Sequence, residues 1–196
     1  EARLFGVGSA MPASQAKRLC PDAIVIAPNS EAYREVSRAV MVVIGNHIER
    51  FEQLGIDEAF LDLEGLHSPK SAMRRLVADI YESTLMRASI GIGPNRLVAK
   101  VASDAEKPNG FLVLTAEEAQ RRFAGSPVSL VPGIGPRTSE RLAELAITTL
   151  AQLRAADEAT LIERFGARQG PALIALARFD ASAELVTDRE AVSESR

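Results

Sequence analysis

The pattern of apolar and polar positions divides the chain into two parts. Before residue 115, short apolar runs alternate with segments in which apolar side chains recur every three or four positions, the spacing of one helix face. Apolar runs bounded by glycine or proline predict strands. The expected helices of this part are 10–21, 31–45, 68–85 and 95–107, and the expected strands are 22–28, 51–65, 86–93 and 110–115.

Strands separated by helices predict an α+β fold, in which one mixed sheet carries helices packed on a face. Ser68 with Pro69, and Asn95, are typical of helix starts. At Thr115 the pattern changes, because TAEE is a capping box and the following residues to about 185 have helical spacing, with turns at PGIGP and FGARQG. We therefore expect a second, all-helical unit, followed by a polar, aperiodic linker over 187–196.

Composition narrows the class of protein. The 196 residues are 46% hydrophobic and 25% charged, which is ordinary for a soluble globular protein. The single cysteine, Cys20, excludes an internal disulfide and is interpreted as an apolar filler in a cytoplasmic protein. No apolar run reaches the roughly 18 residues that cross a bilayer. The net charge of −3 gives no overall cationic field, so any contact with nucleic acid must be local.

The segment GIDEAFLDLEG places two carboxylates, Asp57 and Glu58, in an otherwise apolar run. Neighbouring side chains on a strand point to opposite faces, and burying an unpaired carboxylate is costly. At a strand end beside a turn, both could instead converge on Mg²⁺, which prefers oxygen ligands. The alternative is a purely structural acidic step at the edge of a hairpin.

The helix expected over 95–107 carries Arg96, Lys100 and Lys107 near one face. A solvated charged stripe explains them equally well. Lys107, however, precedes Pro108 at the helix end, from which a side chain can reach into a cleft. Acidic metal ligands opposite basic residues are what phosphoryl or nucleotidyl transfer needs.

The turn in VPGIGPRTSERL contains Gly133 and Gly135 and leads into a helix whose first turn holds Arg137 and Thr138. Glycines let a ligand approach the backbone, and N–H groups at a helix start bind phosphate without reading a base. FGARQGPAL repeats the pattern more loosely. We interpret the two as helix-hairpin-helix units on a sugar-phosphate backbone; the alternative is a plain helical turn.

The order of the motifs ARLFGVGSAMP, GIDEAFLD, GIGPNRLVAKVASDAEKPNG and VPGIGPRTSERL resembles the Y-family translesion DNA polymerases, most closely the DNA polymerase IV branch. The resemblance covers nearly the whole chain. It implies error-prone, template-directed DNA synthesis in DNA repair. The implied regions are partial fingers (1–29), a palm without its first strand (30–115), a helical thumb (116–186) and a linker toward a little-finger domain (187–196).

The resemblance also implies the roles of single residues. Asp57 and Glu58 match catalytic metal ligands for two Mg²⁺ ions, and Arg3 and Lys107 match residues that hold the triphosphate of the incoming deoxynucleotide. Ser9 and Ala10 match small finger residues over the nascent base pair. The implied DNA-backbone residues on the primer–template are Gly133, Gly135, Arg137 and Thr138.

Departures from the family pattern limit what we expect of this chain alone. The family's opening palm strand, with its first metal-binding aspartate and aromatic steric gate, has no counterpart, and Gly55 stands where many relatives have serine. The little-finger domain and the sliding-clamp tail of the full-length protein are missing too. We therefore expect little or no turnover from the chain by itself.

Three other interpretations stay open. A non-catalytic helix-hairpin-helix DNA-binding module would treat the acidic pair as structural. A palm-like nucleotide cyclase shares paired acids on a sheet, but the VPGIGP turn argues against it. An accessory subunit would bind another polymerase rather than DNA.

Overall fold

The computed structural model describes residues 1–185 and forms two compact units, the first spanning Glu1–Glu35 and the second beginning at Val36. The first unit contains the 3₁₀ helix η1 (Ala2–Phe5), the helix α1 (Ala13–Leu19) and the start of α2 (Ser30–His47). Cys20 is buried in it, as expected of an apolar filler. The strand predicted over 22–28 is wrong, because these residues form no strand and Ile24, Val25 and Ile26 are exposed.

The second unit begins with a strand layer. A hairpin pairs β1 (Phe51–Gln53) with β2 (Ala59–Leu61) in antiparallel fashion, and β3 (Ile90–Ile92) pairs with β4 (Phe111–Val113) in parallel. The prediction of one mixed sheet is therefore wrong for residues 1–185, where no hydrogen-bonded ladder joins β2 to β3. The segment 51–65, expected to be one strand, reverses direction between Gln53 and Ala59.

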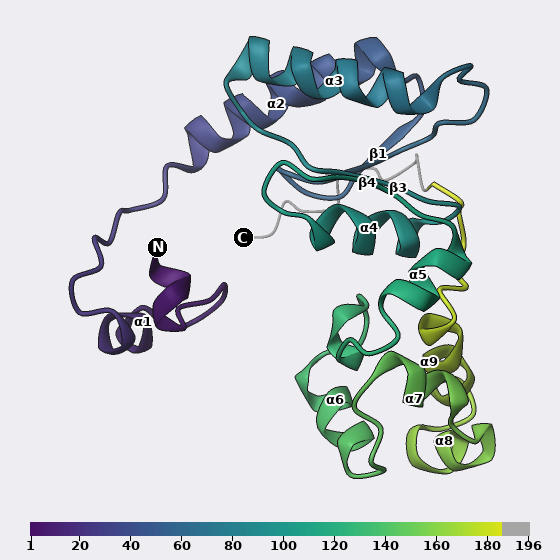
Figure 1. Cartoon of the computed structure of the whole chain (residues 1–196). Coiled ribbons are helices and arrows are strands. Elements are labelled where there is room, and N and C mark those ends of the chain that lie inside the picture. The colour runs from purple at the N-terminus through teal and green to yellow at the C-terminus, as the bar shows by residue number, and fades with distance from the viewer. Residues whose placement is uncertain (186–196) are drawn as a thin grey trace. The chain divides into compact units, whose positions relative to one another are not determined.

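Helices cover both faces of the strand layer (Figure 1). On one face, α2 and α3 (Pro69–Thr84) enclose a core in which Ile44, Met73 and Leu76 are buried, and residues of all four strands pack against it. On the other face lies α4 (Arg96–Ala105), the crossover helix that makes the parallel pairing of β3 and β4 possible. The helix starts predicted at Asn95 and Pro69 are confirmed.

A glycine lets α4 lie directly on β3. A methyl group at Gly91 would be 2.0 Å from the Ala99 carbonyl oxygen and 2.3 Å from the Ser103 nitrogen. Real side-chain carbons do not approach backbone atoms this closely, so only glycine permits this contact. The IGIG sequence is thus a packing requirement, and it fixes the height of α4 above the strands.

The residues after β4 are helical, as predicted. Their elements are α5 (Ala116–Arg122), the 3₁₀ helix η2 (Val128–Leu130), α6 (Pro136–Ala143), α7 (Leu150–Ala155), α8 (Glu158–Phe165) and α9 (Gln169–Ala177). The capping box at Thr115 and Glu118 is confirmed by both of its hydrogen bonds. The predicted linker, 187–196, lies outside the described residues.

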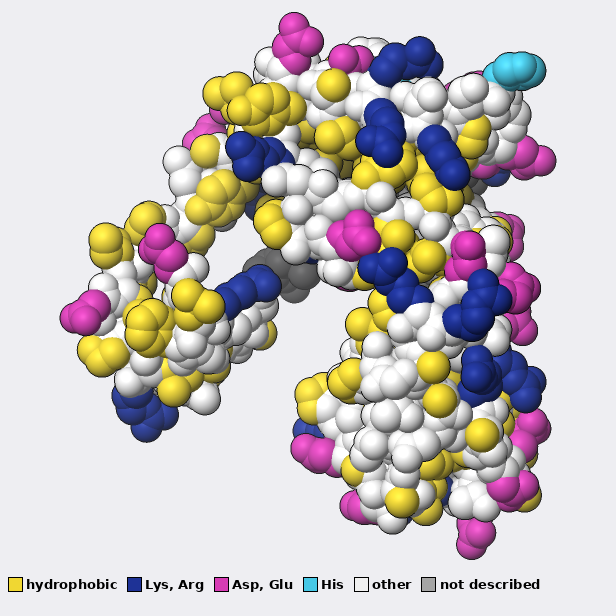
Figure 2. All heavy atoms as spheres, viewed as in Figure 1, with side chains coloured by type: hydrophobic (Ala, Val, Ile, Leu, Met, Phe, Trp, Pro, Cys, Tyr) yellow, Lys and Arg dark blue, Asp and Glu magenta, His cyan; other side chains and the backbone are white. Residues whose placement is uncertain are grey.

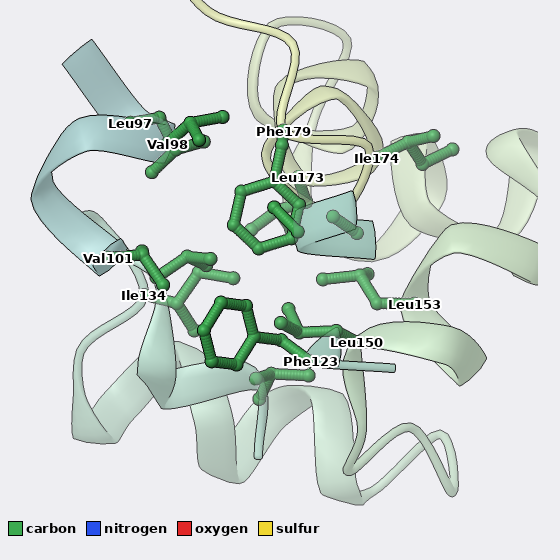
Figure 3. Close-up of a cluster of buried hydrophobic side chains, with 14 of the residues drawn as sticks. Leu97, Val98, Val101, Phe123, Ile134, Leu150, Leu153, Leu173, Ile174 and Phe179 are labelled. Atoms are coloured by element: carbon green, nitrogen blue, oxygen red, sulfur yellow. The ribbon is translucent and has the colours of Figure 1, made fainter. Parts of the chain in front are cut away.

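The core of this helical region extends into α4. Leu97, Val98 and Val101 join Phe123 and Phe179 in one buried cluster (Figure 3). The two phenylalanine rings lie 6.1 Å apart, centroid to centroid. One helix therefore contacts the strands with one side and completes the core of the helical region with the other.

Candidate nucleotidyl-transfer site

The acidic pair lies where the β1–β2 hairpin re-enters the strand layer. The Leu54 N–H donates to the Glu58 carbonyl oxygen at 2.9 Å, and the Gln53 side chain donates to the Gly55 carbonyl oxygen at 2.8 Å. These bonds close the hairpin loop, so Asp57 is a loop residue and Glu58 immediately precedes β2. The expectation that the two share one strand is thus wrong, and their placement beside a turn is confirmed.

The two carboxylates differ in their contacts. Asp57 is exposed and its side chain makes no hydrogen bond or ion pair within residues 1–185. Glu58 is partly buried and forms an ion pair with Lys100 of α4. The free carboxylate and the paired carboxylate are adjacent in the chain, so both are available at one edge of the hairpin.

Lys100 begins a line of alternating charges along α4. Its Nζ lies 3.4 Å from Asp104 Oδ2, and Asp104 Oδ1 lies 2.6 Å from the Nζ of Lys107. The line Glu58, Lys100, Asp104, Lys107 joins the acidic step to the lysine at the helix end. The structure therefore links Glu58 and Lys107, both predicted site residues, through Lys100 and Asp104, which were not among the predicted site residues.

Neighbouring charges in this line stabilise the charged forms of Lys100 and Asp104. Burial alone would lower the pKa of the Lys100 ammonium, but the hydrogen bond to Glu58 and the charge of Asp104 outweigh it and raise the pKa. Burial alone would raise the pKa of Asp104, but the hydrogen bond from Lys107 and the charge of Lys100 outweigh it and lower the pKa. Both groups are therefore charged at neutral pH.

The acidic pair offers a metal ion carboxylate oxygens, the donors that Mg²⁺ prefers. Within residues 1–185, no group of three or more histidine, cysteine, aspartate or glutamate side chains is arranged to hold a metal. The described part of the chain thus fits a metal site to which it contributes two carboxylates, with water, substrate phosphates or further ligands completing the coordination.

Arg96, at the start of α4, ties the hairpin to the segment after α9. It lies 3.2 Å from the buried carboxylate of Glu52, stacks on Phe60 at 4.6 Å and donates to the Glu184 carbonyl oxygen at 3.2 Å. A cavity of about 480 Å³ borders it, but none of the predicted site residues lines this cavity. Sequence reasoning missed Glu52; the available signal was a carboxylate next to Phe51 at the start of an expected strand.

Three of the predicted nucleotide-binding residues belong to the first unit. Arg3 lies in η1 and is exposed. Ser9 and Ala10 form an exposed turn, in which Ala10 has a left-handed φ of 60° and the Met11 N–H donates to the Gly8 carbonyl oxygen. The turn presents small side chains, as the sequence predicts.

The predicted backbone-binding turn precedes α6. Gly133 has φ 98°, a left-handed conformation that favours glycine, and Gly135 is the N-cap of α6. Arg137 is exposed and Thr138 is partly exposed in the first helical turn. The element before the turn is the three-residue η2 rather than a full helix. Figure 2 shows cationic and acidic side chains mainly along the edges of the helical region, whose centre in this view is mostly uncharged.

No helix within residues 1–185 combines the length and the apolar character of a membrane span.

Known proteins resemble this chain in sequence and in fold. Residues 1–104 match the model of the impB/mucB/samB family. DNA polymerase IV of Caulobacter vibrioides is 41% identical over 170 residues, which are 84% of this chain and 42% of that protein. DNA polymerase IV of Pseudomonas fluorescens is 38% identical over 185 residues, which are 91% of this chain and 51% of that protein. The chain thus spans about half the length of these relatives.

Solved structures agree with this relationship. A crystal structure of DinB from Sulfolobus solfataricus has a TM-score of 0.83 and 28% identity, and the match covers 95% of this chain and 56% of that one. An insertion ternary complex of Dbh DNA polymerase has a TM-score of 0.80 and 28% identity, over 94% of this chain and 55% of that one. The family model matches more than half of the residues, and the chain therefore belongs to the impB/mucB/samB family of Y-family DNA polymerases.

Proposed function

We propose that this chain is the catalytic part of a translesion DNA polymerase that extends a primer on a DNA template. The observation that carries the proposal is the line of ion pairs from Glu58 through Lys100 and Asp104 to Lys107. It joins carboxylates suited to a metal with a cation suited to a triphosphate, the combination that nucleotidyl transfer requires. The relatives named DNA polymerase IV and the Dbh ternary complex support the same reaction.

Each residue of the site has a role in this proposal. Asp57 and Glu58 would hold Mg²⁺, and Lys107 and Arg3 would bind the triphosphate of the deoxynucleotide. Mg²⁺ held by these carboxylates would lower the pKa of the primer 3′ hydroxyl and neutralise charge on the leaving pyrophosphate. The hairpin holds the carboxylates and Lys107 follows α4, and the Glu58–Lys100 ion pair and the contact of Arg96 with the Phe60 ring join the hairpin to α4.

Template handling is assigned to the other predicted residues. Ser9 and Ala10, which have small side chains, would lie over the nascent base pair and leave room for a damaged base. Gly133, Gly135, Arg137 and Thr138 would bind the DNA backbone, because the exposed N–H groups and the cation at this helix start suit a phosphate. In this assignment residues 1–29 are partial fingers, 30–115 palm and 116–186 a helix-hairpin-helix thumb. A sliding-clamp partner and a cytoplasmic location stay predictions.

Primer extension with Mg²⁺ tests the proposal. It compares the chain with a chimera in which the chain replaces the matching 170 residues of the Caulobacter vibrioides polymerase. We expect extension by the chimera and little or none by the chain alone. Asp57→Asn in the chimera should reduce the rate by about 100-fold or more, because it removes a charged metal ligand. Asp180→Asn, a change at an exposed aspartate after α9, should leave the rate unchanged.

The competing DNA-binding module predicts a different result. In that case the chimera binds primer–template and never extends it, and Asp57→Asn changes neither binding nor stability. Extension that survives Asp57→Asn would contradict the proposed metal role. Robust extension by the chain alone would contradict the expectation that its two carboxylates do not suffice.

A further inference from the structure

Asp104 divides its carboxylate between two lysines. One oxygen lies 2.6 Å from the Nζ of Lys107, and the other lies 3.4 Å from the Nζ of Lys100, which also contacts Glu58. Both lysines are therefore held from the same point on α4: Lys100 lies one turn before Asp104, and Lys107 lies two residues after Ala105, the last residue of the helix. No other hydrogen bond or ion pair of the Asp104 side chain occurs within residues 1–185.

The helix dipole does not explain an aspartate at this position. Asp104 lies in the last turn of the helix, where the unpaired carbonyl groups make the local potential negative and disfavour an acidic side chain. Glu106, two residues later, is paired with Arg122 of α5 at 2.9 Å and so connects two helices. In the part of the chain that the structure describes, the Asp104 side chain joins no other element to α4, and its ion pairs are with the two lysines.

Partial exposure makes the pair with Lys107 exchangeable. The Lys107 side chain is 55% exposed and that of Asp104 is 41% exposed, so water screens their attraction. A free lysine side chain samples many rotamers, and an ion pair restricts it to few. A triphosphate carries more negative charge than one carboxylate and can displace it from the ammonium group.

We propose that Asp104 is a positioning residue that holds Lys107 in place while the nucleotide site is empty and releases it to the incoming triphosphate. The inference rests on the proposed function, since it deepens the role of Lys107 at that site. Asp104 retains Lys100, and thereby Glu58, when Lys107 leaves. The carboxylate thus competes with the substrate for one lysine and keeps the other on the acidic pair.

Because Asp104 and the triphosphate compete for Lys107, removing the charge of Asp104 should strengthen triphosphate binding. Asp104→Asn keeps the shape of the side chain and removes its charge, so Lys107 is no longer neutralised. The local charge becomes more positive by one unit, which favours a triphosphate. We expect the variant to bind a deoxynucleoside triphosphate about three to ten times more tightly than the original chain. A purely structural role of Asp104 would instead weaken binding.

Equilibrium binding of Mg²⁺ and dATP to the complete 196-residue chain tests this. Lys107→Met should weaken binding about tenfold, because it removes the cation that the triphosphate contacts. Glu106→Gln is the matched control: it makes the same charge change two residues away without touching the lysine pair, and it should alter affinity less than twofold. Thermal unfolding of each variant confirms that the fold is kept.

A second measurement needs no nucleotide. In the ¹⁵N-labelled chain, the side-chain ammonium signal of Lys107, identified by its loss in Lys107→Met, should be visible at low temperature and should broaden in Asp104→Asn. Weaker binding by Asp104→Asn, or binding unchanged as in Glu106→Gln, would overturn the inference, as would an unchanged ammonium signal. A chain that binds no dATP, with Lys107→Met equally inert, counts against the proposed function itself.

Discussion

Glycine serves opposite purposes on the strand side of α4 and in the turn before α6. At Gly91 an added methyl group would meet backbone atoms of α4 at 2.0 and 2.3 Å, so the residue is required by packing. At Gly135 such a methyl group would meet nothing within 4 Å, and at Gly133 only the tip of Leu176, at 3.6 Å. A glycine of the first kind is required for close packing of the fold. Only the second kind leaves backbone N–H groups open to a phosphate.

The looser repeat, FGARQGPAL, contains one glycine of each kind: Gly166 has φ 91° and a methyl group there would meet nothing within 4 Å, whereas Gly170 belongs to the first kind. A methyl group at Gly170 would be 2.8 Å from the Ile162 nitrogen and 2.9 Å from the Leu161 carbonyl carbon, so this glycine lets α9 cross closely over α8. The two glycine-rich turns of the helical region look alike in sequence and are unequal in structure. The proposed DNA contact is therefore stronger for the turn at Gly133 and Gly135.

The largest expected effect follows from Gly91→Ala. The methyl group would collide with the backbone of α4, which cannot move without leaving the strands, and we expect the free energy of unfolding to fall by about 3 kcal/mol or more. Denaturant unfolding measures the loss. Gly125→Ala is the control, since its methyl group meets no atom within 4 Å, and it should change stability by less than about 1 kcal/mol. Equal stabilities of the two variants would contradict the packing role.

Gly170→Ala should have the next largest effect. The contact with the α8 backbone is less severe than at Gly91, and we expect a loss of about 1 to 3 kcal/mol in the free energy of unfolding. DNA affinity measured well below the unfolding temperature should stay within twofold. A variant of full stability with reduced DNA affinity would show instead that this turn binds DNA.

A smaller effect is expected at the open turn. Arg137→Gln should weaken binding to primer–template DNA about threefold without loss of stability, because the exposed cation contributes one phosphate contact. The slope of log K against log salt should fall by about 0.9. The matched change in the other turn, Arg168→Gln, should leave both quantities unaltered. Equal effects of the two changes on DNA binding would contradict the proposed difference between the two turns.

The smallest effect concerns the charges on α4. The pKa of Asp104 lies below its usual range because the lysine contacts outweigh burial. A carboxyl group whose pKa is lower in the folded state stabilises the fold above its unfolded pKa of about 3.9, and this contribution disappears as the pH falls through the folded value. The difference in unfolding free energy between the original chain and Asp104→Asn should therefore shrink below about pH 4. A difference that stays constant from pH 7 to pH 3 would contradict this.

Local signals predicted local structure well. Asn95 accepts a hydrogen bond from the Val98 N–H as a helix cap should, and the TAEE sequence forms its capping box, because each signal involves residues only three positions apart. Periodicity also placed the long helices α2 and α3 within a few residues. Ser68 precedes α3 as expected, although its side chain makes no cap hydrogen bond.

Structural features that depend on residues far apart in the chain could not be predicted from the sequence. The apolar run 51–65 predicted one strand, since nothing in its pattern records that Glu58 bonds back to Leu54 and closes a hairpin. The acidic pair and Lys107 were recognised from their positions in the sequence and from family motifs, whereas Asp104 looked like an ordinary helical charge. Its role emerges only when the hairpin and α4 are seen in contact, because the line of ion pairs crosses 42 positions of sequence between Glu58 and Lys100.

The placement of α4 between two packed layers has a consequence for local unfolding of the chain. Val98 and Val101 belong to the core of the helical region, while the same helix rests on β3 and β4. Amide hydrogens of α4 should therefore exchange with solvent among the slowest in the chain, since releasing them requires both layers to separate at once. A piece expressed from residue 116 onward would lack one wall of its own core, and the shortest piece that keeps the wall begins before Asn95.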